Sequence, residues 1–233
     1  MLPRTLEPEV METADDASDY DAMDHRAVNA AFVEDLLAAG LLSALPAEGE
    51  DGIQPPLDVL DVGTGTARIP IALCERVPEA RVMAVDAAEE MLLLARLNVE
   101  VAGLRDAIQL DLIDAKRMPY PDGYFSAVIS NSIVHHIPEP AAVLAEIVRV
   151  CRPGGSLFVR DLVRPASVSE VERLVELYAG GEVDHARALF RDSLHAALTL
   201  GEVQALVAPL GFGPETVKMT SDRHWTWTAV KPG

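Results

Sequence analysis

A short run of glycines and aspartates near residue 60 has the residue types and spacing of a ligand-binding turn. Leu57–Val62 is largely apolar, Gly63, Thr64 and Gly65 follow at once, and the next residues have helical periodicity. Glycines let the main chain turn sharply and let a ligand approach it closely, and the first turn of a helix offers free N–H groups. The succession of strand, glycine turn and helix predicts a ligand cradle at the carboxyl end of a parallel strand.

Two aspartates flank this turn. Asp61 lies two residues before Gly63, and Asp86 ends the next strand-like segment. An acid at the end of the second strand of a βαβ unit is typical of ribose binding. A helix cap is the alternative role for Asp86, and the two roles are compatible. The turn reads Gly-x-Gly-x-Ala, which is shorter than the dinucleotide-binding motif and has Ala67 in place of a third glycine.

Strand-like and helix-like segments alternate through the middle of the chain, which predicts a parallel sheet with helices on both faces. The last two strand-like runs are joined by a short polar turn and must pair antiparallel. We therefore expect an α/β, Rossmann-like doubly wound sheet, mostly parallel, with an antiparallel C-terminal hairpin strand. The predicted strands are Leu57–Val62, Arg81–Val85, Ala107–Leu112, Phe125–Ser130, Ser156–Leu162, Glu215–Ser221 and His224–Val230, and the predicted helices between them include Ala67–Arg76, Glu89–Val101, Ala141–Cys151 and Asp184–Ala197.

The two ends of the chain carry the remaining segments. Residues 1–19 are acidic and poor in large apolar side chains, and we expect them to be flexible. Residues 20–233 are expected to form a single domain. Within it, residues 20–45 and 163–198 are expected to be helical and to cover the active site.

The ordered set of motifs resembles class I S-adenosylmethionine-dependent methyltransferases, and most closely the small-molecule group that includes the ubiquinone and menaquinone C-methyltransferases. The resemblance runs from about Tyr20 to Val230. The matching segments are Leu60–Ala67 for the first motif, Val85–Met91 for the ribose loop, Asp114–Ala115 with Met118–Asp122 for the segment beside the adenine, Phe125–His136 for the fourth strand and its loop, and Leu144–Leu157 for the helix and turn before the fifth strand.

The resemblance implies S-adenosylmethionine as cofactor and S-adenosylhomocysteine as product. Met91 suits the core of a helix as well as it suits an adenine contact. The implied cofactor residues are Asp61, Gly63, Thr64, Gly65, Ser130 and Asn131 toward the methionine end, Asp86 at the ribose, and Ala87, Met91, Asp114 and Ala115 at the adenine.

Methyl transfer from a sulfonium is an in-line displacement, so orientation of the reactants supplies most of the rate. A general base is needed only where the acceptor must first lose a proton. His135 and His136 follow the fourth predicted strand and are the candidate catalytic bases, with a structural hydrogen bond as the alternative role. The sequence has no His-x-x-x-His or Cys/His cluster, so we expect no metal site.

Polar residues in the two expected covering segments are the candidates for binding the methyl acceptor. Arg160 and Asp161 end a central strand, where burying a charge is costly unless it is paired or bound to a ligand. A mutual salt bridge, or one to Arg164, is the structural alternative. This polar set favours a small polar acceptor over a long prenyl quinone. The candidates are Tyr20, His25, Arg160, Asp161, Arg164, His185, Arg191 and His195.

Composition limits the partners. A net charge of −18 argues against nucleic acid. We expect no membrane partner and no transmembrane helix, because no run of 18 apolar residues occurs. The N-terminus does not resemble a secretory signal, and Cys74 and Cys151 are expected to be buried thiols, so a cytoplasmic location is expected. The oligomeric state stays open, a homodimer included.

Two other functions compete with methyl transfer. A nucleotide-dependent oxidoreductase on a Rossmann sheet shares the glycine turn and the ribose acid, but it predicts a third glycine and a parallel sixth strand. A non-catalytic module that binds the cofactor without transferring methyl would carry the same motifs.

Overall fold

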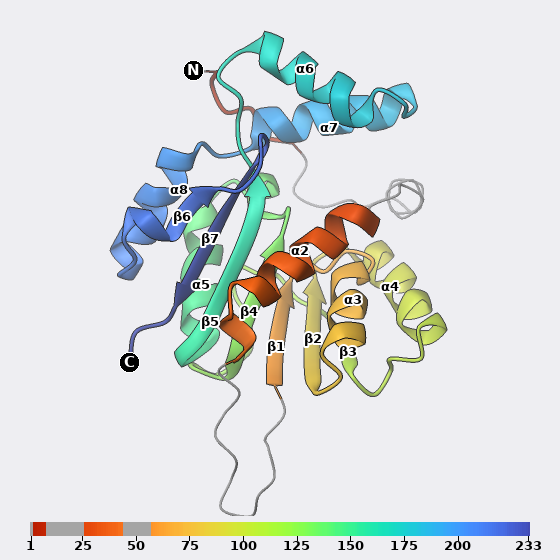
Figure 1. Ribbon diagram of the computed structural model, residues 1–233, viewed down its shortest axis with the longest axis vertical. Coiled ribbons are helices and arrows are strands. Elements are labelled where there is room, and N and C mark those ends of the chain that lie inside the picture. Colours follow the sequence, from red (N-terminus) through yellow and green to blue (C-terminus); the bar gives the residue numbers. More distant parts are fainter. Residues whose placement is uncertain (1, 8–25, 44–56) are drawn as a thin grey trace, which may run out of the picture.

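The computed structural model describes residues 2–7, 26–43 and 57–233, and its centre is a single mixed sheet (Figure 1). In the described chain the strand order is β3-β2-β1-β4-β5-β7-β6. Strands β1 to β5 are parallel, and β7 runs antiparallel to both β5 and β6, which confirms the expected fold class. The strands are β1 Leu57–Val62, β2 Ala80–Asp86, β3 Ile108–Leu112, β4 Phe125–Asn131, β5 Cys151–Leu162, β6 Val217–Met219 and β7 His224–Val230.

Helices lie on both faces of the sheet and beyond one end of it (Figure 1). One face carries α2, α3 and α4, the other carries α5 and α8, and the paired helices α6 and α7 lie beyond the carboxyl end of β5. The helices are α2 Arg26–Ala38, α3 Arg68–Arg76, α4 Glu89–Val101, α5 Pro140–Val150, α6 Val168–Ala179, α7 Asp184–Ala196 and α8 Leu200–Val207, with short 3₁₀ turns η1 Leu41–Ser43, η2 Val134–His136, η3 Ala208–Leu210 and η4 Pro214–Thr216.

The alternation of side chains along β1 explains the two layers of core. Val59 faces one side, where it packs in a buried cluster with Phe32 of α2. Leu60 faces the other side and packs with Ile147 of α5. Side chains alternate across a strand with a period of two, so a strand that is apolar on both sides is buried on both faces. The strand order reverses between the neighbours β1 and β4, so their carboxyl ends form the topological switch point, where ligands bind in sheets of this kind.

The predicted start of β5 is wrong. Pro153, Gly154 and Gly155 are a typical turn signal, yet the strand begins at Cys151. The pairing with β4 shifts register between Phe125 and Ala127, so the glycines lie in a bulge rather than in a loop. The Gly154 N–H donates to Lys231, which continues the pairing with the C-terminal strand.

Within residues 1–19, which the sequence predicts to be flexible, the structure describes residues 2–7, and these contact the rest of the fold. Leu2 packs against the small core between α6 and α7. Arg4 donates hydrogen bonds to the carbonyls of Ala196, His135 and Ile137, at 2.7, 3.0 and 2.9 Å. These carbonyls lie at the end of α7 and around η2, where the main chain lacks regular partners. An arginine near the N-terminus therefore anchors this segment although its composition resembles that of a flexible tail.

The two expected covering segments occupy different places. The second half of α2 packs on the sheet, where Phe32 meets Phe158 edge-to-face with ring centroids 5.1 Å apart, and its N-terminal end points toward the carboxyl edge (Figure 1). Helices α6 and α7 lie beyond the carboxyl edge itself. Among the described residues, no helix has the length and apolar character needed to cross a membrane.

Candidate functional site

The glycine turn between β1 and α3 is held against the carboxyl end of β2. The N–H groups of Gly63 and Thr64 both donate to the Val85 carbonyl, at 2.8 and 2.9 Å. The Gly65 N–H donates to Asp86 Oδ2 at 2.8 Å, and the Ala88 N–H donates to Oδ1 at 2.9 Å. The Asp86 carboxylate is therefore fixed beside the turn, at the carboxyl edge of the sheet.

The turn leaves no space for a side chain at its first glycine. Gly63 has φ +74°, and a Cβ atom there would lie 1.9 Å from Ile133 Cγ2. Ala67, at the position of the missing third glycine, also adopts the left-handed conformation, with φ 62°. The turn thus keeps a glycine-like backbone at its alanine and packs directly on the segment that follows β4.

The two carboxyl groups at the turn have perturbed pKa values. Burial raises the pKa of Asp61 to about 7; the neighbouring Asp86 adds to the rise, and Thr64 opposes it. Burial also raises the pKa of Asp86, against the opposing effect of the N–H groups of Ala88 and Gly65. A fixed carboxylate at this edge is a good acceptor for the two hydroxyls of a ribose, and the close main chain suits an approaching ligand, so these residues fit the cofactor that the sequence implies.

The other residues expected near the cofactor are spread along the same edge. Met91 is buried in α4, and Ala87 is exposed just after β2. Asp114 is exposed and accepts a hydrogen bond from the Lys116 N–H at 2.9 Å. Ser130 Oγ donates to the Val62 carbonyl at 2.8 Å and so ties β4 to β1. Ser130 is fully buried, so its hydroxyl serves the sheet in this structure. Ala115 and Asn131 are half-buried.

Arg149 of α5 organises the segment after Asp114. Its guanidinium donates to the carbonyls of Met118 and Tyr120 at 2.9 and 2.7 Å, and to both carboxylate oxygens of Glu146. The hydrogen bonds to Glu146 and Asp122 raise the pKa of Arg149 above its ordinary value. The sequence analysis missed this role, because Arg149 lies on a helix about thirty residues away in the sequence.

The two histidines after β4 lie in a buried cluster of charged groups. His135 Nδ1 is 2.5 Å from Asp161 Oδ1, and the His135 N–H donates to Asp161 Oδ2 at 3.0 Å. Burial alone would lower the pKa of His135, but Asp161 outweighs burial and raises it; the same pairing lowers the pKa of Asp161. Asp161 therefore orients the His135 ring.

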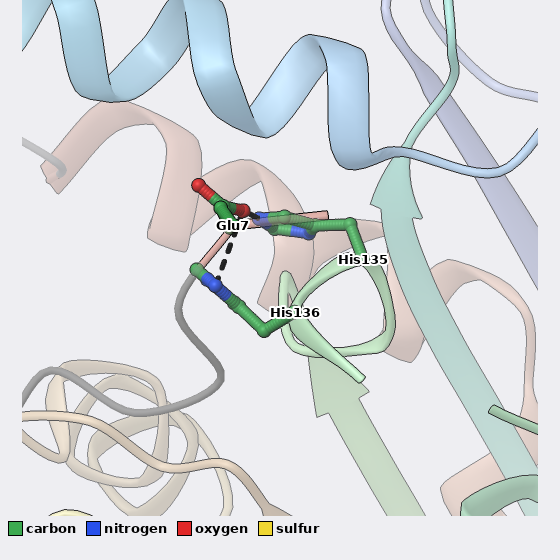
Figure 2. Close-up of side chains that lie close together, drawn as sticks. All are labelled: Glu7, His135 and His136. Carbon is green, nitrogen blue, oxygen red and sulfur yellow. Dashed lines mark ion pairs between the residues drawn. The ribbon is translucent and has the colours of Figure 1, made fainter. Parts of the chain in front are cut away.

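Glu7 completes this cluster from the N-terminal segment, as Figure 2 shows. Glu7 Oε1 lies 3.5 Å from His135 Nε2 and 3.1 Å from His136 Nδ1. Ser193 of α7 donates to Glu7 Oε2 at 3.1 Å. Burial raises the pKa of Glu7. No sequence signal marked Glu7, since it lies in the segment expected to be flexible.

Arg160 and Asp161 do not pair with one another, contrary to the structural alternative drawn from the sequence. Neighbouring residues of a strand point to opposite faces. The Arg160 guanidinium accordingly lies on the α2 side, 2.6 Å from Asp35 Oδ2, and donates to Thr226 Oγ1 at 3.0 Å. Arg164 pairs instead with Glu202 at 2.6 Å. Both guanidinium groups are bound within the protein.

The remaining acceptor candidates are dispersed. Arg191 forms a surface ion pair with Glu172 at 2.7 Å. On α7, His185 is exposed and His195 is half-buried. Tyr20 and His25 lie outside the described residues. Of the acceptor candidates that the structure describes, Asp161 alone lies in the cluster with His135 and His136.

The sheet order, the glycine turn and the antiparallel β7 define the fold of class I methyltransferases. A methyltransferase from Aquifex aeolicus described as S-adenosylmethionine-dependent has the same fold, with a TM-score of 0.65 at 18% identity, covering 94% of this chain and 98% of that one. Residues 60–159 match the family described as "Methyltransferase domain". Through these residues the chain belongs to that family, whose cofactor is S-adenosylmethionine.

Curated relatives extend the match beyond this core. The demethylmenaquinone methyltransferase of Thermus thermophilus is 36% identical over 110 residues, which are 47% of this chain and 49% of the relative. The malonyl-[acyl-carrier protein] O-methyltransferase of Geobacter sulfurreducens is 31% identical over 200 residues, 84% of this chain and 66% of the relative. The chain spans about half to two thirds of the length of such relatives. Their names differ in the acceptor, so the family does not specify one.

Proposed function

We propose that this protein transfers a methyl group from S-adenosylmethionine to a small polar metabolite at the carboxyl edge of the sheet. The observation that carries the proposal is the Asp86 carboxylate, fixed by the N–H groups of Gly65 and Ala88 at the glycine turn. When bound, the cofactor supplies a methyl group already activated on a sulfonium. The chain has to bind and orient the two reactants in line and exclude water.

The residues divide this work by position. Asp86 would accept hydrogen bonds from the ribose, and the main chain from Gly63 to Gly65 would lie against the amino acid end. Helices α6 and α7, together with η2, would enclose the acceptor. The polar cluster of His135, Asp161 and Glu7 supports a polar acceptor over a prenyl chain, because an apolar chain would leave these buried groups without compensation.

His135 and His136 remain candidates for handling an acceptor proton. Asp161 already engages His135 Nδ1, so only the Nε2 side of that ring can face an acceptor. Methyl transfer to an acceptor that is already nucleophilic needs neither histidine. We also propose a cytoplasmic location, which the two buried, unpaired thiols Cys74 and Cys151 support.

The first test is calorimetric titration with S-adenosylmethionine, S-adenosylhomocysteine, NAD and NADP. We expect the two sulfur compounds to bind, and Asp86→Asn to weaken both at least about tenfold, the value of one charge-assisted hydrogen bond. Asp111→Asn, at an exposed aspartate of β3 that pairs with Val85, the residue before Asp86, is the matched control and should leave the affinity unchanged. Binding of NAD without either sulfur compound would contradict the proposal.

Product formation separates an enzyme from a non-catalytic binding module. Conversion of S-adenosylmethionine to S-adenosylhomocysteine should accelerate with one or more members of a panel of small carboxylates, phenols and amines. Tight cofactor binding with no turnover on any such panel would instead favour the binding module.

A further inference from the structure

The cluster of Glu7, His135 and His136 has the composition of a metal-ion site. Each residue turns one potential ligand atom toward the others, and the three atoms lie within 4.8 Å of one another (Figure 2). Only 8% of the Glu7 side chain, 4% of the His135 side chain and 20% of the His136 side chain are exposed. The residues come from the N-terminal segment and η2, so the fold, and not sequence spacing, brings them together.

We propose that Glu7, His135 and His136 bind a divalent transition-metal ion, with zinc as the best match. Zinc bonds of about 2.0–2.1 Å in tetrahedral geometry place ligand atoms roughly 3.3 Å apart. Glu7 Oε1 lies 3.1 Å from His136 Nδ1 and 3.5 Å from His135 Nε2, on either side of that value. Two imidazoles and one carboxylate form a common zinc set that leaves a fourth position open to water or a ligand.

The surroundings of the cluster resemble those of a metal site. Asp161 engages His135 Nδ1, which directs the opposite nitrogen, Nε2, toward Glu7. Metal-binding histidines almost always donate their other ring N–H to a carboxylate, a main-chain carbonyl or water, which fixes the ring and its tautomer. Ser193 holds Glu7 Oε2. Among the described residues Glu7 Oε1 is buried without a hydrogen-bond donor, so the atom that faces the histidines is the one left for an ion.

The balance of charge also favours a cation. Glu7 and Asp161 bring two carboxylates into a buried region, and Arg4, the nearest arginine in the N-terminal segment, directs its guanidinium to main-chain carbonyls around η2 and at the end of α7. Two carboxylates buried side by side are costly unless positive charge lies close to them. A divalent ion supplies that charge and links the N-terminal segment to η2.

In this proposal the two histidines bind an ion, whereas under the proposed methyl transfer they are candidates for accepting a proton. The segment that carries the two histidines packs on the glycine turn, since Gly63 lies against Ile133, which is two residues before His135. The open position of the ion would suit an oxygen or nitrogen of an acceptor. Binding of the ion itself does not depend on methyl transfer.

The test is metal binding by the untagged full-length protein after treatment with a chelator and dialysis. Titration with Zn²⁺ in a calorimeter should show one ion per chain, and Co²⁺ should give the visible absorption of a four-coordinate site. His136→Ala and the isosteric Glu7→Gln should each weaken Zn²⁺ binding at least about tenfold. His185→Ala, an exposed histidine of α7, is the control and should bind as the wild type does.

Two results would overturn the proposal. One is the absence of stoichiometric Zn²⁺ binding by wild-type protein whose circular dichroism shows that it is folded. The other is equal affinity in Glu7→Gln, His136→Ala and wild type, which would place the ion elsewhere. All these readouts omit S-adenosylmethionine and acceptor, so a failure here leaves the proposed methyl transfer standing, and the reverse also holds.

Discussion

Substitution of Gly63 tests how closely the glycine turn packs on the segment after β4. Gly63→Ala has two costs. The left-handed backbone, with φ +74°, costs an alanine about 1–2 kcal/mol. The new Cβ would lie 1.9 Å from Ile133 Cγ2, and relieving such a clash in a packed region costs about 1–3 kcal/mol more. The sum, about 2–5 kcal/mol, is a large part of a typical stability of 5–15 kcal/mol.

Gly103→Ala is the matched control, because Gly103 has nearly the same φ, +70°, but no atom within 4 Å of a new Cβ. Urea unfolding of both variants isolates the clash, and we expect Gly63→Ala to lose about 1–3 kcal/mol more than Gly103→Ala. Adding Ile133→Ala should cost less in the Gly63→Ala background than in the wild type, since it removes the clashing methyl group. Equal losses for the two glycine variants would refute the packing argument.

Three further predictions concern buried or bridging charges. Asp61, with its pKa raised to about 7, retains a proton that the unfolded chain releases, so the free energy of unfolding of the wild type falls as pH rises from 5 to 8. In urea unfolding, the stability of Asp61→Asn relative to the wild type should therefore rise by about 3 kcal/mol over that range, and a constant difference would contradict this. Arg160→Met should lower the free energy of unfolding by about 1–2 kcal/mol and leave S-adenosylhomocysteine affinity unchanged. Arg191→Met, at a surface ion pair, should have no measurable effect on stability, and equal stability of the two variants would count against a structural role for Arg160. Arg149→Ala should accelerate amide hydrogen exchange at Met118 by about tenfold, and unchanged exchange would remove Arg149 as the anchor of that segment.

The regular elements were predictable where a contiguous pattern determines them. The helix Glu89–Val101 has the predicted bounds, since its periodicity and its ending before Gly103 are local signals. The start of β5 was not predictable, because Pro153, Gly154 and Gly155 suit a turn and a bulge equally well. The choice depends on pairing with Phe125 and with the C-terminal strand, which no local pattern records.

The candidate site divides in the same way. The glycine turn and Asp86 belong to one βαβ unit, and the sequence places them together at the edge of the sheet. Glu7 and Arg149 act on segments far away in the sequence, so only the folded chain reveals them. Arg160 and Asp161 are neighbours in the sequence but serve opposite faces of the sheet, and a pattern of residue types does not show which charge each one meets.

The glycine turn and the cluster of Glu7, His135 and His136 are connected through the segment that follows β4. Gly63 packs on Ile133, and the chain then turns into η2, where His135 is bound through both its N–H and its ring to Asp161 on β5. A ligand that orders the glycine turn must therefore act on the position of Ile133, and an ion held by His135 must act on the same segment from the other side. Coupling between two binding equilibria is reciprocal. If Ile133 transmits it, S-adenosylhomocysteine and Zn²⁺ should change each other's affinity by the same factor, and shortening Ile133 to alanine should bring that factor toward one.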